Sequence, residues 1–308
     1  MSNPVRDVTP ALLRDWSLPD AGDSKYSRGQ VFVVGGAAST PGAVQLTGLA
    51  ALRVGAGHLT LAVAESTAVP LAVATPEAGV YGLPQSGDGS VLGGDLSVIV
   101  DSLGSADVVV IGPGLDHPEH TADLVRQAVP HLGDDAWLIL DAYALGVLPG
   151  LEEVMDPVRG RLILTPNKSE ASRLLGREVD DLAEDVVEIA RRYHAVVTCQ
   201  NLVANESGDR WQIGAGHIGL ATSGSGDVLA GAVAGMLARG AEPTQAADLL
   251  DLHQEQDPAL EELPRHLHHE LRDLGGVLGA AQLLQAPLQD RELPRHLLGR
   301  GRRGRGWG

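Results

Sequence analysis

The chain has 308 residues, of which 44% are hydrophobic and only 3% aromatic, so its core has to be built largely from Ala, Val and Leu. Its formal net charge of −17 excludes the broad basic surface that proteins use to bind nucleic acid. The single cysteine, the absence of an uncharged apolar run of about 18 residues and the polar N-terminus predict a cytoplasmic protein without an intramolecular disulfide or a membrane partner.

Short apolar runs alternate with helical segments along most of the sequence. Residues 1–30 are polar and contain prolines, and we expect an irregular arm there. After it, in chain order, we expect strand Val31–Val34, helix Gly42–Ala56, strand Leu59–Val63, strand Asp107–Ile111, helix His120–Val129, strand Trp137–Asp141, strand Arg161–Thr165, helix Ser169–Leu175, a helix from Asp181 to Arg192, strand Ala195–Cys199 and a hairpin of Leu202–Ala204 with Arg210–Ile213. This alternation predicts an α/β fold with a mostly parallel sheet covered by helices on both faces.

Glycines and polar residues follow directly after the predicted strands. In parallel sheets ligands bind beyond the carboxyl ends of the strands, so these positions are the candidates for a site. They are Gly35-Gly36, Gly112-Pro113-Gly114, Asp141, Thr165–Glu170 and Gln200-Asn201.

The composition changes at the C-terminal end of the chain. The string ELPRHL occurs at Glu262–Leu267 and again at Glu292–Leu297, and Gly299–Gly308 is basic and rich in glycine. We therefore expect one domain over residues 1–247 and a divergent tail over 248–308 that is partly helical and then disordered. A replaced or frameshifted end is a further possibility, which resequencing of the gene would test.

The strongest chemical motif is Thr222-Ser223-Gly224-Ser225-Gly226-Asp227, followed by the helical stretch VLAGAVAGMLARG. A glycine turn at a helix N-terminus exposes unpaired backbone N–H groups, which favour phosphate. We expect Gly224, Ser225 and Gly226 to bind a nucleotide phosphate there. Asp227 then stands where it could accept a proton from a substrate hydroxyl as a general base. The alternative is that Asp227 only caps the helix.

The segment GLATSGSGDVLAGAVAGMLARG resembles the signature of the NAD(P)H-hydrate dehydratases of the ribokinase-like superfamily. Further segments agree in the same order, namely VFVVGGAASTPGAVQLTGLAALRVGAGHLTLA, DVVVIGPGL, LILDAYAL and LILTPNKSEASRLLG. The resemblance covers about residues 8–247 and implies a ribokinase-like three-layer fold. It also implies dehydration of NADHX or NADPHX, driven by ADP or ATP with Mg²⁺, through phosphorylation of the C6 hydroxyl, in a homo-oligomeric enzyme.

Four residues match the functional positions of that family. By the resemblance, Asp227 is the catalytic and substrate-binding aspartate, and Ala43 and Gly114 contact the substrate. Gly226 matches a glycine on the phosphate side of the nucleotide.

Three positions depart from the family pattern. Asn167 stands in place of a substrate-binding histidine, and it can form hydrogen bonds without carrying charge. Glu170 three residues later is retained, and it could hold Mg²⁺ through water or could serve only as a first-turn carboxylate favoured by the helix dipole. Gln200 and Asn201 replace a Lys-Gly pair near the nucleotide, and Asp141 keeps only the first carboxylate of an Asp-Ala-Asp motif. Cys199 is expected to be a buried strand residue.

Two other functions stay open at this point. One is a small-molecule kinase of the same superfamily, such as a vitamin-precursor kinase, which would release a stable phosphate ester. The other is a nucleotide-binding protein that has lost catalysis, suggested by the missing lysine and histidine.

Overall fold

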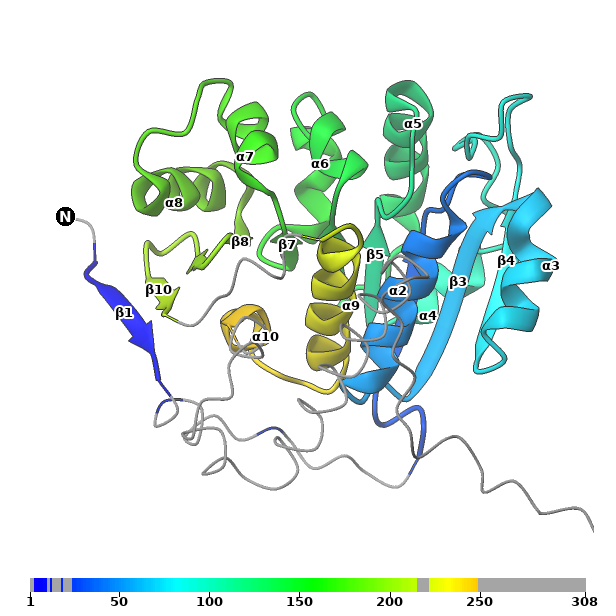
Figure 1. The fold of residues 1–308 in the computed structure, drawn as a ribbon, viewed down its shortest axis with the longest axis horizontal. Helices are drawn as coiled ribbons and strands as arrows, with labels where there is room; N and C mark the ends of the chain where they lie inside the picture. The colour runs from blue at the N-terminus through cyan, green and yellow to red at the C-terminus, as the bar shows by residue number, and fades with distance from the viewer. Residues whose placement is uncertain (1–2, 10–11, 13–17, 19–23, 215–221, 249–308) are drawn as a thin grey trace, which may run out of the picture.

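One ten-stranded sheet crosses the protein in the computed structural model, which describes residues 3–9, 12, 18, 24–214 and 222–248 (Figure 1). The strand order is β1-β10-β9-β8-β7-β6-β5-β2-β3-β4, and only β9 runs antiparallel to its neighbours. The inner strands are short aliphatic runs, such as VVVI and LIL, because both of their faces are buried. The strands are β1 (Val5–Val8), β2 (Gln30–Val34), β3 (His58–Ala64), β4 (Ala78–Leu83), β5 (Val108–Ile111), β6 (Trp137–Leu140), β7 (Leu162–Leu164), β8 (Ala195–Cys199), β9 (Leu202–Ala204) and β10 (Arg210–Ile213).

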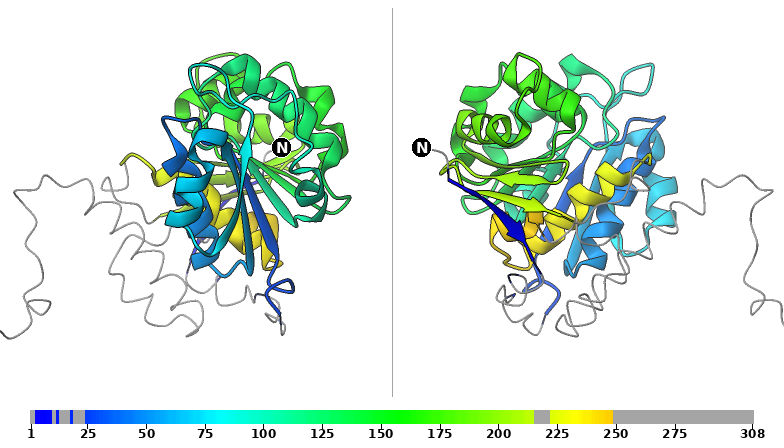
Figure 2. Two further views of the ribbon diagram at one scale, coloured as in Figure 1. Left: turned by 90° about the vertical axis from the view of Figure 1, so that its right-hand side faces the viewer. Right: turned by 60° about the vertical axis from the view of Figure 1, so that its left-hand side comes forward.

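Helices cover both faces of the sheet and form two separate apolar layers with it (Figures 1 and 2). On one face lie α2 (Pro41–Arg53), α3 (Glu65–Ala74), α9 (Ser225–Ala238) and α10 (Pro243–Asp248). On the other lie α4 (Val100–Ser105), α5 (Pro118–Ala128), η1 (Val129–His131), α6 (Tyr143–Val147), η2 (Glu152–Val158), α7 (Lys168–Leu175) and α8 (Leu182–Tyr193). The predicted three-layer α/β architecture is therefore confirmed.

Helices α2 and α9 lie side by side and pack closely (Figure 1). Gly231 and Gly235 of α9 face the backbone of α2, where a Cβ at Gly231 would lie 2.0 Å from the Thr47 carbonyl oxygen. A Cβ at Gly235 would lie 2.4 Å from the carbonyl oxygen of Ala51. Only glycine permits this approach. Because α9 carries the predicted phosphate cradle at its start, this packing sets where the cradle stands relative to α2.

Helix α9 ends in a glycine turn at Gly240. Gly240 has a φ of +87°, its N–H donates to the Leu237 carbonyl, and the Ala241 N–H donates to the Met236 carbonyl. These two bonds form a Schellman motif, which satisfies the last carbonyls of the helix.

The prediction of an irregular arm over residues 1–30 is wrong for its first part. Val5–Val8 forms β1, which pairs in parallel with β10 through the register Val5↔Arg210 to Val8↔Ile213. Val8 is buried in the same apolar layer as Trp211. The open edge of β10 supplies backbone partners that no local pattern in residues 3–9 could reveal.

The other predicted strands are confirmed to within about two residues, including β8 and the β9–β10 hairpin. The prediction omitted α3, β4, α4, α6 and α10. Helix α3 contains Pro70, and β4 has two glycines in the sequence AGVYGL, so neither has a clear periodic pattern. The predicted tail, apart from Asp248 at the end of α10, lies outside the described residues. Within the described part of the chain, no helix is both long enough and apolar enough to cross a membrane.

Candidate active site

The glycine turns after β2 and β5 lie against each other at the carboxyl edge of the sheet. The Gly36 N–H donates to the Pro113 carbonyl over 2.8 Å, and the Thr40 hydroxyl donates to the Gly114 carbonyl over 2.7 Å. Gly114 has a φ of +69°, and a Cβ there would lie 2.4 Å from the Thr40 carbonyl oxygen and 3.1 Å from the Cβ of Ala43. The structure thus brings Ala43 and Gly114, the two predicted substrate contacts on these turns, side by side.

The start of α9 presents an open glycine corner beside a carboxyl group. Gly224 is the N-cap residue with a φ of +89°, followed by Ser225, Gly226 and Asp227 in the first turn. A Cβ at Gly226 would meet no described atom within 4 Å, so the backbone is accessible at this point. The Ser225 N–H donates to the Thr222 carbonyl over 3.3 Å, so one of the three N–H groups predicted to bind phosphate is already engaged.

Asp227 does not cap α9, because Gly224 occupies the N-cap position. Within the described residues its carboxyl group has neither a hydrogen bond nor an ion pair, although it is half-buried. Burial raises its pKa to about 6. At pH 7 the group is therefore mostly ionised, yet basic enough to take up a proton.

Asp141 follows β6 and is buried, with 5% of its surface exposed. Its Oδ1 accepts a hydrogen bond of 2.6 Å from the Thr165 hydroxyl, at the end of the neighbouring strand β7. The pKa of Asp141 is raised to about 7, mainly by burial; the Thr165 hydrogen bond opposes this rise, and the nearby charges of Asp227 and Glu170 contribute to it. Carboxyl groups from β6, α7 and α9 therefore converge at one edge of the sheet.

Asn167 and Glu170 form a capping box at the start of α7. The Glu170 N–H donates to Asn167 Oδ1, and the Asn167 N–H donates to Glu170 Oε2, both over 2.9 Å. Glu170 is half-buried, and burial raises its pKa. The structural role of Glu170 at the start of the helix is thus present in the molecule. The capping hydrogen bond uses only one of its two carboxylate oxygens.

The turn between β8 and β9 holds Gln200 and Asn201 at the same edge of the sheet. Gln200 is exposed and has a φ of +55°. The Asn201 side chain donates to the Ile213 carbonyl over 3.4 Å, which ties the turn to β10. Cys199 before the turn is buried, as predicted, and burial raises the pKa of its thiol to about 12. Of the two predicted nucleotide contacts, Asn201 therefore has a structural role and Gln200 has a freer side chain.

Two features of this edge were not predicted. The first is the contact between Asp141 and Thr165, which was itself a predicted site position; the contact could have been found because Leu140 and Leu164 are partners in the β6–β7 register. The second is Ala142, which has a φ of +46° and a ψ of −116°, a conformation that a non-glycine residue rarely adopts. Its strain has no local signal in the sequence.

The residues present fit a magnesium ion that is held mainly by the phosphates of a nucleotide. The described residues contain no group of three His, Cys, Asp or Glu side chains placed to hold a metal directly. Mg²⁺ in nucleotide sites usually keeps several waters and takes only one or two carboxylates, with the remaining ligands from phosphate. Glu170 and Asp141 could meet this need through water.

Comparison with known proteins relates the sequence to one family. A family model described as NAD(P)H-hydrate dehydratase matches residues 31–250. An ADP-dependent (S)-NAD(P)H-hydrate dehydratase of Xanthomonas campestris is 41% identical over 79% of this chain and 84% of its own length. A bifunctional NAD(P)H-hydrate repair enzyme of Moorella thermoacetica is 36% identical over 79% of this chain and 47% of its own length, so the chain spans about half of that relative.

Solved structures agree with the fold. An ADP/ATP-dependent NAD(P)H-hydrate dehydratase from Bacillus subtilis, co-crystallised with ATP and Mg²⁺, has a TM-score of 0.64 and 26% identity over 90% of this chain and 98% of that one. A ribokinase-like superfamily protein from Enterococcus faecalis has a TM-score of 0.69 at 22% identity over 90% of this chain and 96% of that one. The predicted ribokinase-like fold is therefore confirmed.

Proposed function

The chain belongs to the NAD(P)H-hydrate dehydratase family, and on that premise we propose that it dehydrates (6S)-NADHX and NADPHX to NADH and NADPH with ADP or ATP. One observation carries the proposal: the half-buried Asp227 carboxylate has no partner among the described residues and stands beside the open glycine start of α9. A carboxylate that only supported the fold would have a partner. This arrangement suits a base that acts next to a bound phosphate.

In the proposed reaction Asp227 accepts the proton of the C6 hydroxyl while the oxygen of that hydroxyl attacks the terminal phosphorus of the nucleotide. The new C6–O–P linkage forms as the bond from that phosphorus to the nucleotide's bridging oxygen breaks, which releases AMP from ADP or ADP from ATP. Phosphate then leaves with the electron pair of the C6–O bond, C5 loses a proton, and the ring double bond returns. The phosphorylation matters because hydroxide is a poor leaving group and phosphate a good one.

The remaining residues bind and orient the two reactants. The start of α9 at Gly224, Ser225 and Gly226 receives the transferred phosphate, since a helix N-terminus favours an anion. The Ser225 N–H already donates to the Thr222 carbonyl over 3.3 Å, so the glycines on either side of it are the expected backbone donors. Ala43, Gly114 and Asn167 contact the hydrated nicotinamide substrate, and Gln200 with Asn201 borders the nucleotide. Glu170 would hold Mg²⁺ through water, and the ion when bound neutralises charge on the phosphates.

The identity of the nucleotide is supported by the relatives' names, which are ADP-dependent for the Xanthomonas protein and ADP/ATP-dependent for the Bacillus protein. We favour ADP, because the Xanthomonas protein is the more similar in sequence. Turnover with ATP and not with ADP would reverse this preference.

The deciding experiment incubates the purified protein with Mg²⁺, (6S)-NADHX and either ADP or ATP. Recovery of the absorbance band of reduced nicotinamide supports the dehydratase. A stable phosphate ester without NADH would identify a kinase. Nucleotide binding without any turnover would instead indicate a protein that has lost catalysis.

We also propose a cytoplasmic homo-oligomer that works without nucleic acid or membrane. The single cysteine is free and buried, which suits a reducing compartment. Val69 and Val73 lie one turn apart on α3, with 73% and 78% of their surfaces exposed. Adjacent exposed apolar side chains of this kind are typical of surfaces that contact another protein.

A further inference from the structure

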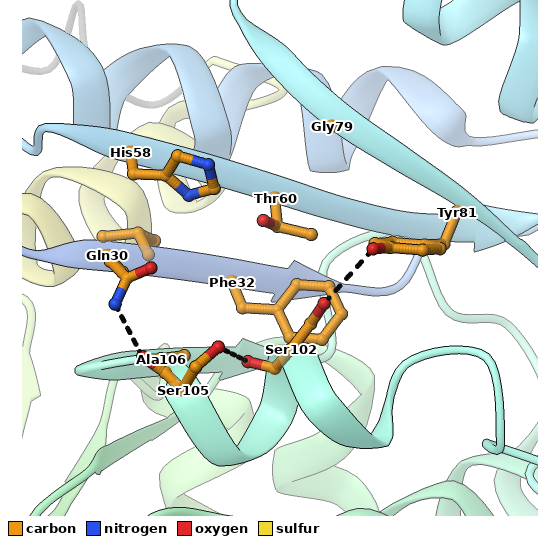
Figure 3. Close-up of a pocket in the computed structure, with 10 residues that line it drawn as sticks. Gln30, Phe32, His58, Thr60, Gly79, Tyr81, Ser102, Ser105 and Ala106 are labelled. Carbon is orange, nitrogen blue, oxygen red and sulfur yellow. Dashed lines mark hydrogen bonds between the residues drawn. The ribbon is translucent and has the colours of Figure 1, made fainter. Parts of the chain in front are cut away.

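A cavity lies at the other end of the sheet from the candidate active site. It has a volume of about 210 Å³ and is bordered by β2, β3, β4 and α4 (Figure 3). Gln30 and His58 are the first residues of β2 and β3, so they mark the amino ends of these strands. The proposed catalytic groups follow the carboxyl ends, so this cavity is a separate site.

The strand register explains why there is space here. Phe32, Thr60 and Gly79 form one row across β2, β3 and β4. Gly79 has no side chain, and a Cβ at that position would meet no described atom within 4 Å. The gap above Gly79 therefore leaves a cavity next to Thr60 that is open to solvent, with the exposed Tyr81 further along β4 (Figure 3).

The Thr60 hydroxyl is a hydrogen-bonding group that lines the cavity and is available to a ligand. Thr60 is 8% exposed, and its side chain has no hydrogen-bond partner within the described part of the chain. Since Thr60 lines the cavity, a ligand or water there would satisfy it.

The rest of the lining combines apolar side chains such as Phe32 with polar ones that carry no charge. Gln30 donates its amide to the Ser105 carbonyl over 2.8 Å, which leaves its amide oxygen as an acceptor. Tyr81 and Ser102 share a hydrogen bond of 3.5 Å (Figure 3). Burial lowers the pKa of His58, with a further contribution from the charge of Lys25, so its ring is neutral at pH 7 and can both donate and accept.

From the unpartnered Thr60 hydroxyl and this uncharged lining, we propose that the cavity binds a small neutral polyhydroxy molecule, between a triol and a monosaccharide in size. Hydroxyls of such a molecule donate and accept, as do Thr60, Tyr81 and His58. A cavity on the order of 150 Å³ accommodates a six-membered carbon ring, so 210 Å³ leaves room for hydroxyl substituents. A charged ligand would find no lining side chain of opposite charge.

The test measures binding of glycerol, D-xylose and D-glucose to the full chain by calorimetry and by saturation-transfer NMR. Nicotinamide and inorganic phosphate serve as an uncharged aromatic and an anionic comparator. We expect saturable binding of at least one polyol, with a dissociation constant on the order of millimolar for a ligand of this size. Absence of binding by all three polyols, or binding of a comparator in their place, would overturn the proposal.

Two variants locate the binding. Gly79→Val fills the space above β4 and should abolish polyol binding. Thr60→Val removes one hydroxyl and should weaken binding up to about tenfold. Thr198→Val is the control, because Thr198 is also a buried threonine whose hydroxyl has no partner among the described residues, but it lies on β8 outside the cavity.

Asp227→Asn is the control for the candidate active site and should leave polyol affinity unchanged. Polyol binding that survives Gly79→Val, or that is lost in Asp227→Asn, would place the ligand elsewhere and refute the assignment. If Gly79→Val does not fold, the polyol affinities of Thr60→Val and Thr198→Val still test the assignment: equal affinities in these two variants would refute it. Because all of these are binding measurements that do not depend on catalytic turnover, their results are independent of the proposed dehydratase activity.

Discussion

At the scale of single residues, the chemistry depends on the Asp227 carboxyl group. Asp227→Asn keeps the shape of the side chain but removes its basicity, so we expect kcat to fall by roughly 10²–10⁴-fold. The stability should not fall, because the replaced group is a half-buried charge without a partner among the described residues. Asp101→Asn changes an exposed first-turn aspartate on α4 and should keep full activity. Full activity in Asp227→Asn would remove this residue from the mechanism.

The pKa of Asp227 predicts how activity depends on pH. The base must be ionised to accept a proton, and its pKa is raised to about 6. We therefore expect kcat/KM to be constant above pH 7 and to fall with a single proton uptake as the pH drops through about 6. A profile that stays flat down to pH 5 would show that no group of this pKa acts as the base.

Asp141 predicts a second effect of pH, this time on stability. Its folded pKa of about 7 lies above its ordinary value of 3.8, so between these values the folded state binds more protons than the unfolded state. The stability gained from this difference is present below pH 3.8 and is lost as the pH rises through 7. Since one pKa unit corresponds to about 1.4 kcal/mol, we expect Tm to decline by several degrees from pH 5 to pH 8.

Asp141→Asn isolates that contribution from those of other groups. Asparagine can still accept the Thr165 hydrogen bond but cannot ionise. The variant should therefore lose less stability than the natural protein between pH 5 and pH 8 in thermal melts. An identical decline in both proteins would assign it to other residues.

At the scale of elements, the start of α7 has two possible roles that a pair of variants separates. Glu170→Gln keeps an oxygen for the capping box but removes the charge, whereas Glu170→Ala removes both. We expect Glu170→Ala to lose about 1 kcal/mol of stability and Glu170→Gln to keep it. If Glu170 also holds Mg²⁺ through water, Glu170→Gln should require several-fold more Mg²⁺ for half-maximal activity. An unchanged Mg²⁺ requirement would leave Glu170 with the capping role alone.

The packing of α9 on α2 gives a prediction for stability. A methyl group at Gly231 would overlap the Thr47 carbonyl, so Gly231→Ala should lower the free energy of unfolding by about 1–3 kcal/mol or more. Gly226→Ala on the same helix is the control, since its Cβ meets no described atom within 4 Å and alanine favours the helix by about 1 kcal/mol. Equal stability of the two variants in denaturant titrations would contradict the close helix contact.

At the scale of the whole molecule, the outer face of α3 is the candidate contact between subunits. Val69→Glu combined with Val73→Glu places two charges on this face and should lower the molar mass measured by light scattering at a given concentration. Val98→Glu is the control, because Val98 is a single exposed residue away from α3, with 55% of its surface exposed. A monomeric natural protein, or an assembly that the double variant leaves intact, would reject this surface.

The parts of the fold predicted from sequence are those whose signal is local. Strands such as β5 and β8 are buried on both faces and so appear as apolar runs. The end of α9 has a glycine that permits a positive φ, which identifies the Schellman motif. The position of Asp227 one turn into a helix also follows from the glycines before it. These features need no information about distant residues.

Tertiary structure decided what depends on neighbours that are remote in the chain. Strand β1 exists because β10 offers its edge, and Thr165 reaches Asp141 because β6 and β7 pair in one register. The raised pKa values of Asp141 and Asp227 require burial that only the assembled layers produce. Sequence by itself therefore determined which chemical groups follow each strand, because propensity and hydrophobic pattern act locally. The sheet order and helix packing determined which of those groups meet and how readily they ionise.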